Sequence, residues 1–117
     1  MDILLNQKAN IIKVQKGEVW LAYDRESKKL RPFLIMSDKL SGIDVDITVT
    51  PFTTKEKRND YDITVEFWRE AGLDILSVVR CSKIHIINVR HFTRKLGKLE
   101  EQDLEHVNDA MRKYLGV

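Results

Sequence analysis

One stretch of the sequence gathers the residue types that could act on a polyanion. A short apolar run at 76–79 predicts a strand, and Arg80 follows at its end, where a charged side chain needs a specific reason to lie. The interval 75–99 holds no Asp or Glu, and it contains six basic residues: Arg80, Lys83, Arg90, Arg94, Lys95 and Lys98. The whole chain carries 20 basic and 18 acidic residues, so its excess positive charge is local. A local positive field attracts polyanions.

Other interpretations of these residues stay open or carry less weight. A solvated basic surface is the commoner meaning of a charge run. The three histidines have no Cys or carboxylate partner at metal-ligand spacing, so we expect no metal site. Ser82 and His85 could form a nucleophile and base, but the third member of a triad is missing. The sequence has no phosphate-binding P-loop and no dinucleotide fingerprint, and we expect no cofactor.

Composition bounds the class of protein. A chain of 117 residues, with 43% apolar and 32% charged residues, fits one globular domain with a single core. Cys81 is the only cysteine, which rules out an internal disulfide and favours a reducing compartment. Residues 1–5 do not resemble a signal peptide, and no apolar run approaches the length of about 20 residues that spans a bilayer. We therefore expect a cytoplasmic protein without a membrane segment.

Several short strands must position the candidate residues. The pattern predicts strands at 19–23, 33–36, 43–50, 61–67, 76–79 and 84–89. The run at 33–36 is apolar throughout and predicts a strand buried on both faces, whereas 43–50 and 61–67 alternate and predict half-buried antiparallel strands with residues such as Asp62 on the polar face. Trp20 is expected to be a core side chain rather than a platform for base stacking.

The two ends of the chain differ from its middle. Residues 1–15 are interpreted as an extension that could form a short helix, and 16–117 as the main domain. Near the C-terminus one apolar stripe at helical spacing predicts a helix, formed by Leu104, Val107, Met111, Tyr114 and Leu115. Acidic residues that include Asp103 match the dipole of its first turn, and Gly116 is a plausible end. Strands followed by one helix predict a curled antiparallel sheet or barrel capped by a helix.

Five blocks in order resemble the MazF/PemK family of toxin endoribonucleases. They are Lys16–Leu21, Arg31–Ile35, Pro51–Thr54, Ser77–Cys81 and Lys95–Leu99 with the terminal helix. The resemblance covers about residues 15 to 117. It implies an SH3-like antiparallel barrel, similar to PemK and CcdB, with a C-terminal helix. It also implies a homodimeric bacterial toxin of a type II toxin–antitoxin system, which cleaves single-stranded RNA at short sequences without a metal and is held inactive by an antitoxin protein.

The resemblance also implies roles for individual residues. Arg31 and Arg80 would stabilise the charge that grows on the phosphate as the neighbouring 2′-hydroxyl attacks it, and Thr53 would hold the phosphate or that hydroxyl. Ser82 would complete the catalytic set. RNA would be bound by Lys28, Lys29, Thr54, Lys55, Lys83 and His85. Without the family pattern, Arg31 would be read as a surface arginine and Thr53 as an ordinary turn residue.

The chain departs from the family pattern at the candidate site. Ser82 stands where the PemK branch has a carboxylate thought to act as general base, and His85 stands where a fixed positive charge is common. The polar loop at 24–29 is also shorter than usual. A second hypothesis follows from these departures: a weakly active or inactive member that binds RNA, an antitoxin or another protein, DNA gyrase included.

Overall fold

The computed structural model describes residues 11–117, and every structural statement below concerns them. These residues form nine strands, a short 3-10 helix and one α-helix. The 3-10 helix η1 (Val89–His91) lies between the eighth and ninth strands, and the α-helix α2 follows the ninth strand. The strands are β1 (Ile12–Gln15), β2 (Glu18–Asp24), β3 (Lys29–Ile35), β4 (Lys39–Gly42), β5 (Asp46–Thr53), β6 (Asp62–Thr64), β7 (Val78–Arg80), β8 (His85–Asn88) and β9 (Phe92–Lys98), and α2 spans Glu101–Leu115. The predicted architecture, mainly antiparallel β with a C-terminal helix, is confirmed.

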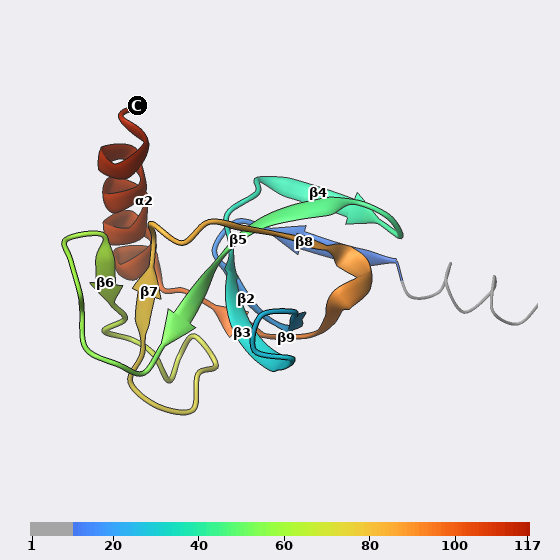
Figure 1. Ribbon diagram of the computed structural model, residues 1–117, viewed down its shortest axis with the longest axis horizontal. Helices are drawn as coiled ribbons and strands as arrows, with labels where there is room; N and C mark the ends of the chain where they lie inside the picture. Colours follow the sequence, from blue (N-terminus) through green and yellow to red (C-terminus); the bar gives the residue numbers. More distant parts are fainter. Residues whose placement is uncertain (1–10) are drawn as a thin grey trace, which may run out of the picture.

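Strand β5 joins the parts of the larger sheet. The strands lie in the order β6-β7-β5-β3-β2-β9, and β8 also pairs with β5. The first half of β5 pairs with β8 and its last residues pair with β7, while β3 pairs with the middle of the strand. Strands β1 and β4 form a separate two-stranded sheet. In Figure 1, α2 stands at one end of the molecule beside β6 and β7, and β1 and β4 lie toward the other end.

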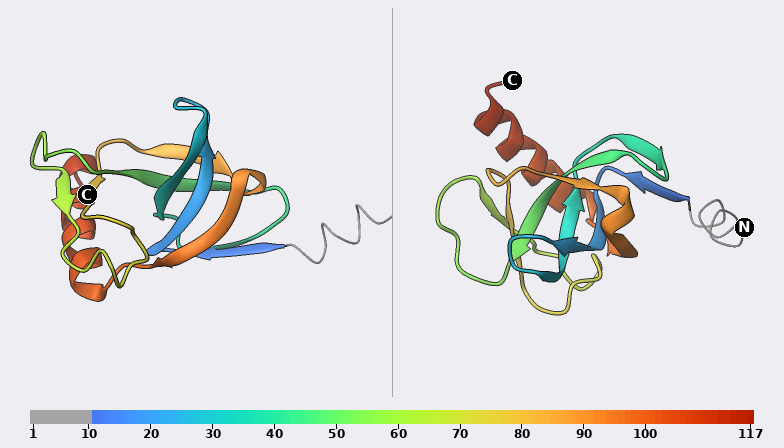
Figure 2. Two further views of the ribbon diagram at one scale, coloured as in Figure 1. Left: turned by 90° about the horizontal axis from the view of Figure 1, so that it is seen from below. Right: turned by 45° about the vertical axis from the view of Figure 1, so that its right-hand side comes forward.

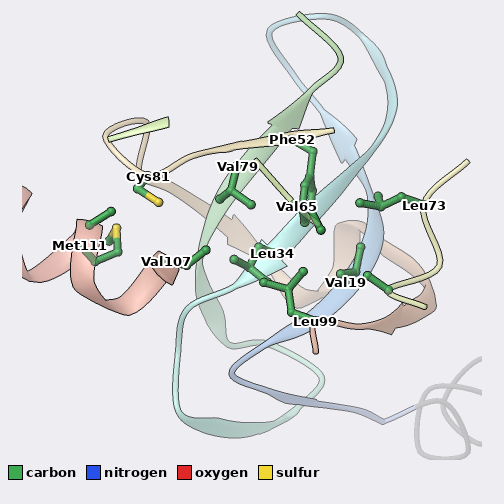
Figure 3. Close-up of a cluster of buried hydrophobic side chains, with 12 residues drawn as sticks. Val19, Leu34, Phe52, Val65, Leu73, Val79, Cys81, Leu99, Val107 and Met111 are labelled. Carbon is green, nitrogen blue, oxygen red and sulfur yellow. The ribbon is translucent and has the colours of Figure 1, made fainter. Parts of the chain in front are cut away.

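Two clusters of buried apolar side chains lie on opposite faces of β3. Leu34 belongs to the cluster that packs under α2, whereas Phe33 and Ile35 belong to the other cluster. Because successive strand residues point to opposite faces, the continuous apolar run is explained by burial on both sides, as predicted. Figure 3 shows the first cluster, in which Val107 and Met111 of α2 face the strands. Trp20 packs against the second cluster and is partly buried, in line with its predicted place in the core.

The C-terminal helix is held by its apolar stripe and by one buried acid. Val107, Ala110 and Met111 are buried, and Gly116 ends the helix with a φ of 74° while its N–H donates to the carbonyl of Arg112. Asp103 lies in the first turn of the helix, as predicted. It is also buried, and its two carboxylate oxygens accept the backbone N–H groups of Glu66 and Phe67 at 3.1 and 2.9 Å. The helix is thereby tied to the segment after β6.

Several predicted strand boundaries were wrong. The strand predicted at 43–50 begins at Asp46 and runs on to Thr53, and Ile43 is exposed in the turn before it. The strand predicted at 61–67 is limited to β6, because hydrogen-bonded turns follow it. Asp62, expected on a solvated face, is fully buried. The predicted strand at 76–79 is β7, which begins two residues later, and β9 was not predicted at all.

The region around β1 falls within the predicted N-terminal extension. Residues 12–15 form a strand rather than the end of a helix, and they pair with β4. The rest of the helix predicted in 1–15 lies outside the described residues. Within residues 11–117, no helix has both the length and the apolar character needed to cross a membrane.

Candidate functional site

An open groove of about 300 Å³ lies where the β2–β3 hairpin, the end of β5 and the connection from β7 to β8 meet. The turn of that hairpin projects from the sheet in the left view of Figure 2. The groove is lined by Asp24, Glu26, Ser27, Arg31, Phe33, Pro51, Phe52, Thr53, Lys55, Arg80, Lys83 and His85. Six of the ten site residues predicted from the sequence are therefore brought together in one groove.

Strand register explains how three distant residues share this groove. Thr53 of β5 pairs with Val78 of β7, so Arg80, two residues along β7, lies on the same face as Thr53. Phe33 pairs with Pro51. Arg31 lies two residues before Phe33 and Thr53 lies two residues after Pro51, so in these antiparallel strands they also share that face. The alternation of side chains thus places both guanidinium groups and the threonine hydroxyl on one side of the sheet.

Arg31 is held in place by the hairpin turn. Its Nε donates to Ser27 Oγ at 2.9 Å, and Ser27 Oγ donates in turn to Asp24 Oδ2 at 2.7 Å. Asp24 Oδ2 also lies 3.6 Å from Arg31 Nε. Burial acts to raise the pKa of Asp24, but the hydrogen bonds from Ser27 and from the backbone N–H of Glu26, with the charge of Arg31, hold that pKa below its usual value. The network engages Nε of Arg31, a residue that also lines the groove.

The other predicted residues of the groove surround Arg80 and Thr53. Thr53 Oγ1 accepts the backbone N–H of Lys55 at 3.2 Å, which leaves the hydroxyl proton available to a ligand. The backbone N–H of Lys83 donates to the carbonyl of Arg80 at 3.0 Å and closes the turn after β7. The ring of His85 packs on Phe33, with 6.0 Å between the ring centroids. Both residues of this aromatic pair line the groove.

Four predicted residues line other surfaces. Ser82 is half-buried in the turn after β7 and is not part of the groove lining. Lys28 and Lys29 are exposed at the tip of the β2–β3 hairpin, where Lys28 has a φ of 60°. Thr54 lines a separate shallow cavity with Leu76 and Val78.

The groove also contains two carboxylates that sequence reasoning missed. Asp24 is the last residue of β2 and Glu26 lies in the turn that follows, where the N–H of Glu26 donates to Asp24 Oδ1 at 3.2 Å. An aspartate followed three residues later by a serine is a common turn pattern, and it would have been the signal that this loop folds back over Arg31. Glu26 is an exposed residue that lines the groove.

Two other chemistries have little support from the geometry. Burial raises the pKa of the Cys81 thiol to about 12, and the negative charge of Asp62 adds to the rise, so this thiol stays protonated at neutral pH. Within residues 11–117, no three His, Cys, Asp or Glu side chains gather in a group that could hold a metal ion.

Comparison with known proteins shows which family the chain belongs to. Residues 15–115 match the family described as the PemK-like, MazF-like toxin of type II toxin–antitoxin systems. The chain belongs to this family. The match begins inside β1 and runs to the end of α2, so it contains every residue of the groove, and the resemblance drawn from the five sequence blocks is confirmed.

Relatives of the family support the same assignment. A protein of Mycolicibacterium smegmatis, described as a probable endoribonuclease MazF, is 27% identical over 107 residues, which cover 89% of this chain and 98% of the relative. The Mycobacterium tuberculosis toxin MazF-mt6 shares the fold with a TM-score of 0.72 at 24% identity, over 86% of this chain and 97% of that one. A mycobacterial endoribonuclease solved in complex with its cognate antitoxin has a TM-score of 0.70 at 17% identity, over 89% and 96%.

Proposed function

We propose that this toxin-family protein is an endoribonuclease that cleaves single-stranded RNA without a metal ion. The observation that carries the proposal is the meeting of Arg31, Thr53 and Arg80, from three different strands, in one groove. Such a groove can take one phosphate between two guanidinium groups, each of which can donate two parallel hydrogen bonds. The family match and the name of the M. smegmatis relative support this activity.

The reaction we propose is attack of a ribose 2′-oxygen on the adjacent phosphorus. The bond from O2′ to phosphorus forms and the bond from phosphorus to O5′ breaks, which leaves a cyclic phosphate and a free 5′-hydroxyl. Arg31 and Arg80 stabilise the negative charge on the phosphorane oxygens, and the hydroxyl of Thr53 orients the phosphate. Because arginine side chains in proteins do not give up their proton, neither Arg31 nor Arg80 is assigned as the acid or the base.

The proton transfers are assigned to side chains that line the groove. Ser82 stands at the position of the family carboxylate, but it lies outside the lining. Glu26 offers a carboxylate that can take the proton from the 2′-hydroxyl, and His85 can donate a proton to the leaving O5′. Glu26 lies in the β2–β3 turn and His85 begins β8, so the proposed base and acid come from elements other than β7.

We also propose a homodimer in the cytoplasm that a cognate antitoxin inhibits. A mycobacterial endoribonuclease has been solved in complex with its cognate antitoxin, and Deinococcus radiodurans MazF has been solved together with MazE. Large apolar side chains are exposed after β7 and at the end of α2, and they are the surface we assign to these partners: Ile84, Ile86, Tyr114 and Leu115.

Cleavage in the presence of EDTA tests the proposed activity. The purified chain should cut a long single-stranded RNA at defined positions, and mapping of the ends should find 2′,3′-cyclic phosphate and 5′-hydroxyl groups. Arg31→Ala and Arg80→Ala should each lower kcat by at least about 100-fold, because each removes a donor to the transition state. Arg94→Ala, on exposed β9, is the matched control and should keep its activity.

Ser82 at the family carboxylate position favours the second candidate function, a toxin-family member that binds RNA or a protein without cutting RNA. A folded wild-type chain that binds the RNA and leaves it intact in EDTA would support that function and reject the first. Salt dependence of binding cannot separate the two, since both would use the same positive groove.

A further inference from the structure

One buried carboxylate beside the groove has no part in the mechanism above. Asp62 of β6 is directly opposite Arg80 of β7, and Thr64 is opposite Val78, which in turn is opposite Thr53. Directly opposed residues of antiparallel strands project to the same face with their Cβ atoms about 5 Å apart. Asp62 therefore lies on the groove face of the sheet, next to Arg80, although it is fully buried.

The contacts of Asp62 engage one of its two oxygens. Oδ2 accepts the backbone N–H of Arg58 at 2.9 Å, and Arg58 Nε lies 3.9 Å away, on a side chain that is half exposed. Within residues 11–117, Oδ1 of Asp62 is buried and has no hydrogen-bond partner, and the same holds for Nε of Arg80. A buried polar atom without a partner is costly and rare in native proteins.

These two atoms are complementary. Oδ1 can only accept a hydrogen bond when the acid is ionised, and Nε of arginine can only donate one. They belong to opposed residues on one face, so a small rotation of the Arg80 side chain, or one water between them, would satisfy both atoms. Arg80 would then be held at Nε, just as Arg31 is held at Nε by Ser27.

We propose that Asp62 is the positioning residue of Arg80. Its Oδ1 binds Nε, directly or through one water, and so aims the two outer nitrogens of the guanidinium at the RNA phosphate. This restores a negative charge next to Arg80 in a chain that has Ser82 where the family pattern has a carboxylate. Asp62 cannot touch RNA because it is fully buried, so it is not the general base. The effect on cleavage rests on the proposed function, whereas the contact itself does not.

The Asp62→Asn variant is designed to remove the contact with Arg80 Nε and to keep the hydrogen bond with the backbone of Arg58. The amide oxygen can still accept the N–H of Arg58, and the amide NH₂ then faces the Nε donor of Arg80. We expect kcat to fall about 100-fold, the cost of a transition-state group that is misplaced by about 1 Å, while the affinity for a non-cleavable RNA stays within about twofold. Asp62→Glu keeps the charge and should recover part of kcat.

A matched control exists in the same chain. Within residues 11–117, Asp103 is the other fully buried aspartate. It belongs to α2, is not part of the groove lining, and accepts two backbone N–H groups where Asp62 accepts one. Asp103→Asn should lower the melting temperature and leave kcat unchanged at a temperature where the protein is folded. If kcat falls in both Asp62→Asn and Asp103→Asn, the loss comes from removing any buried carboxylate, and the proposal is rejected.

The Arg80 Nε–H signal in a nitrogen–proton NMR spectrum tests the contact without RNA. Arg80→Lys identifies the signal by its disappearance. We expect Asp62→Asn to shift this signal and to speed its exchange with water, and Asp103→Asn to leave it in place. An Arg80 signal that Asp62→Asn does not move overturns the proposal, whether or not the wild type cleaves RNA; if Asp62→Asn does not fold, the same criterion is applied to Asp62→Glu. A wild type that cuts no RNA defeats the proposed function instead.

Discussion

The two faces of the β5–β7–β6 region differ in character, although the buried Val78 shares the groove face with the polar residues. On one face, Phe52 pairs with Val79, and both belong to the apolar cluster under α2. On the other face lie Thr53, Arg80 and Asp62, which are the centre of the groove and its buried support. Neighbouring residues of one strand thus have different roles: one packs in the apolar cluster and the next lies on the groove face.

This division follows from the period of a strand. Because successive side chains point to opposite faces, a strand of three residues such as β7 can place Val79 in the core and Arg80 at the surface within one peptide unit. The cluster under α2 fixes the position of the backbone, and the backbone fixes the position of the guanidinium. We infer that substitutions on the inner face lower stability first, and substitutions on the outer face lower activity first.

We expect the largest difference between the two faces when Val79→Ala is compared with Arg80→Ala, because the first should affect mainly stability and the second mainly activity. Val79 is fully buried, so the loss of two methyl groups should lower the free energy of unfolding by about 2 kcal/mol. Its kcat at low temperature should stay within about twofold of the wild type, while Arg80→Ala should lower kcat at least about 100-fold and leave the packing of the inner face in place. Urea unfolding and RNA cleavage on the same samples measure both effects. If Val79→Ala and Arg80→Ala lose activity equally, the proposed division between a stabilising face and an active face is wrong.

Ser27→Ala should have a smaller effect on the outer face. It removes the acceptor of Arg31 Nε and a donor to Asp24, so we expect kcat to fall about fivefold, which corresponds to one hydrogen bond of roughly 1 kcal/mol. The lowered pKa of Asp24 should rise toward its ordinary value of 3.8, which an NMR titration can follow.

The lowered pKa of Asp24 also fixes the direction of a pH effect. A carboxyl whose pKa is lower in the folded state stabilises the fold above its ordinary pKa, and this contribution is lost as the pH falls through the lowered value. The stability difference between wild type and Ser27→Ala should therefore shrink below about pH 4. A difference that stays constant there would remove Asp24 from the network.

The sequence predicted the parts of this molecule that follow a regular period. The run at 33–36 and the stripe of α2 were found because burial on both faces and helical spacing leave clear patterns. Strand β9 was missed because its charged residues hide the alternation, and Asp62 was placed on a solvated face because an alternating pattern does not reveal that a loop covers it.

The site was predicted in part for a similar reason. Arg31, Thr53 and Arg80 came from the family resemblance, and the register of three strands then brought them together. Asp24, Ser27 and Glu26 were missed because their role depends on how the β2–β3 turn folds back over the groove, which a strand pattern does not contain.

The central claim is that Arg31 and Arg80 act on the same phosphate. The most direct test is the kcat of the wild type, Arg31→Lys, Arg80→Lys and the double variant on one RNA in EDTA. Lysine keeps the charge and loses the planar fork, so each single variant should retain measurable cleavage. Groups that act as a unit are not additive, and we predict that the double variant is much less impaired than the product of the two single effects. Two effects that multiply fully would show that the arginines act at separate places and would contradict the account.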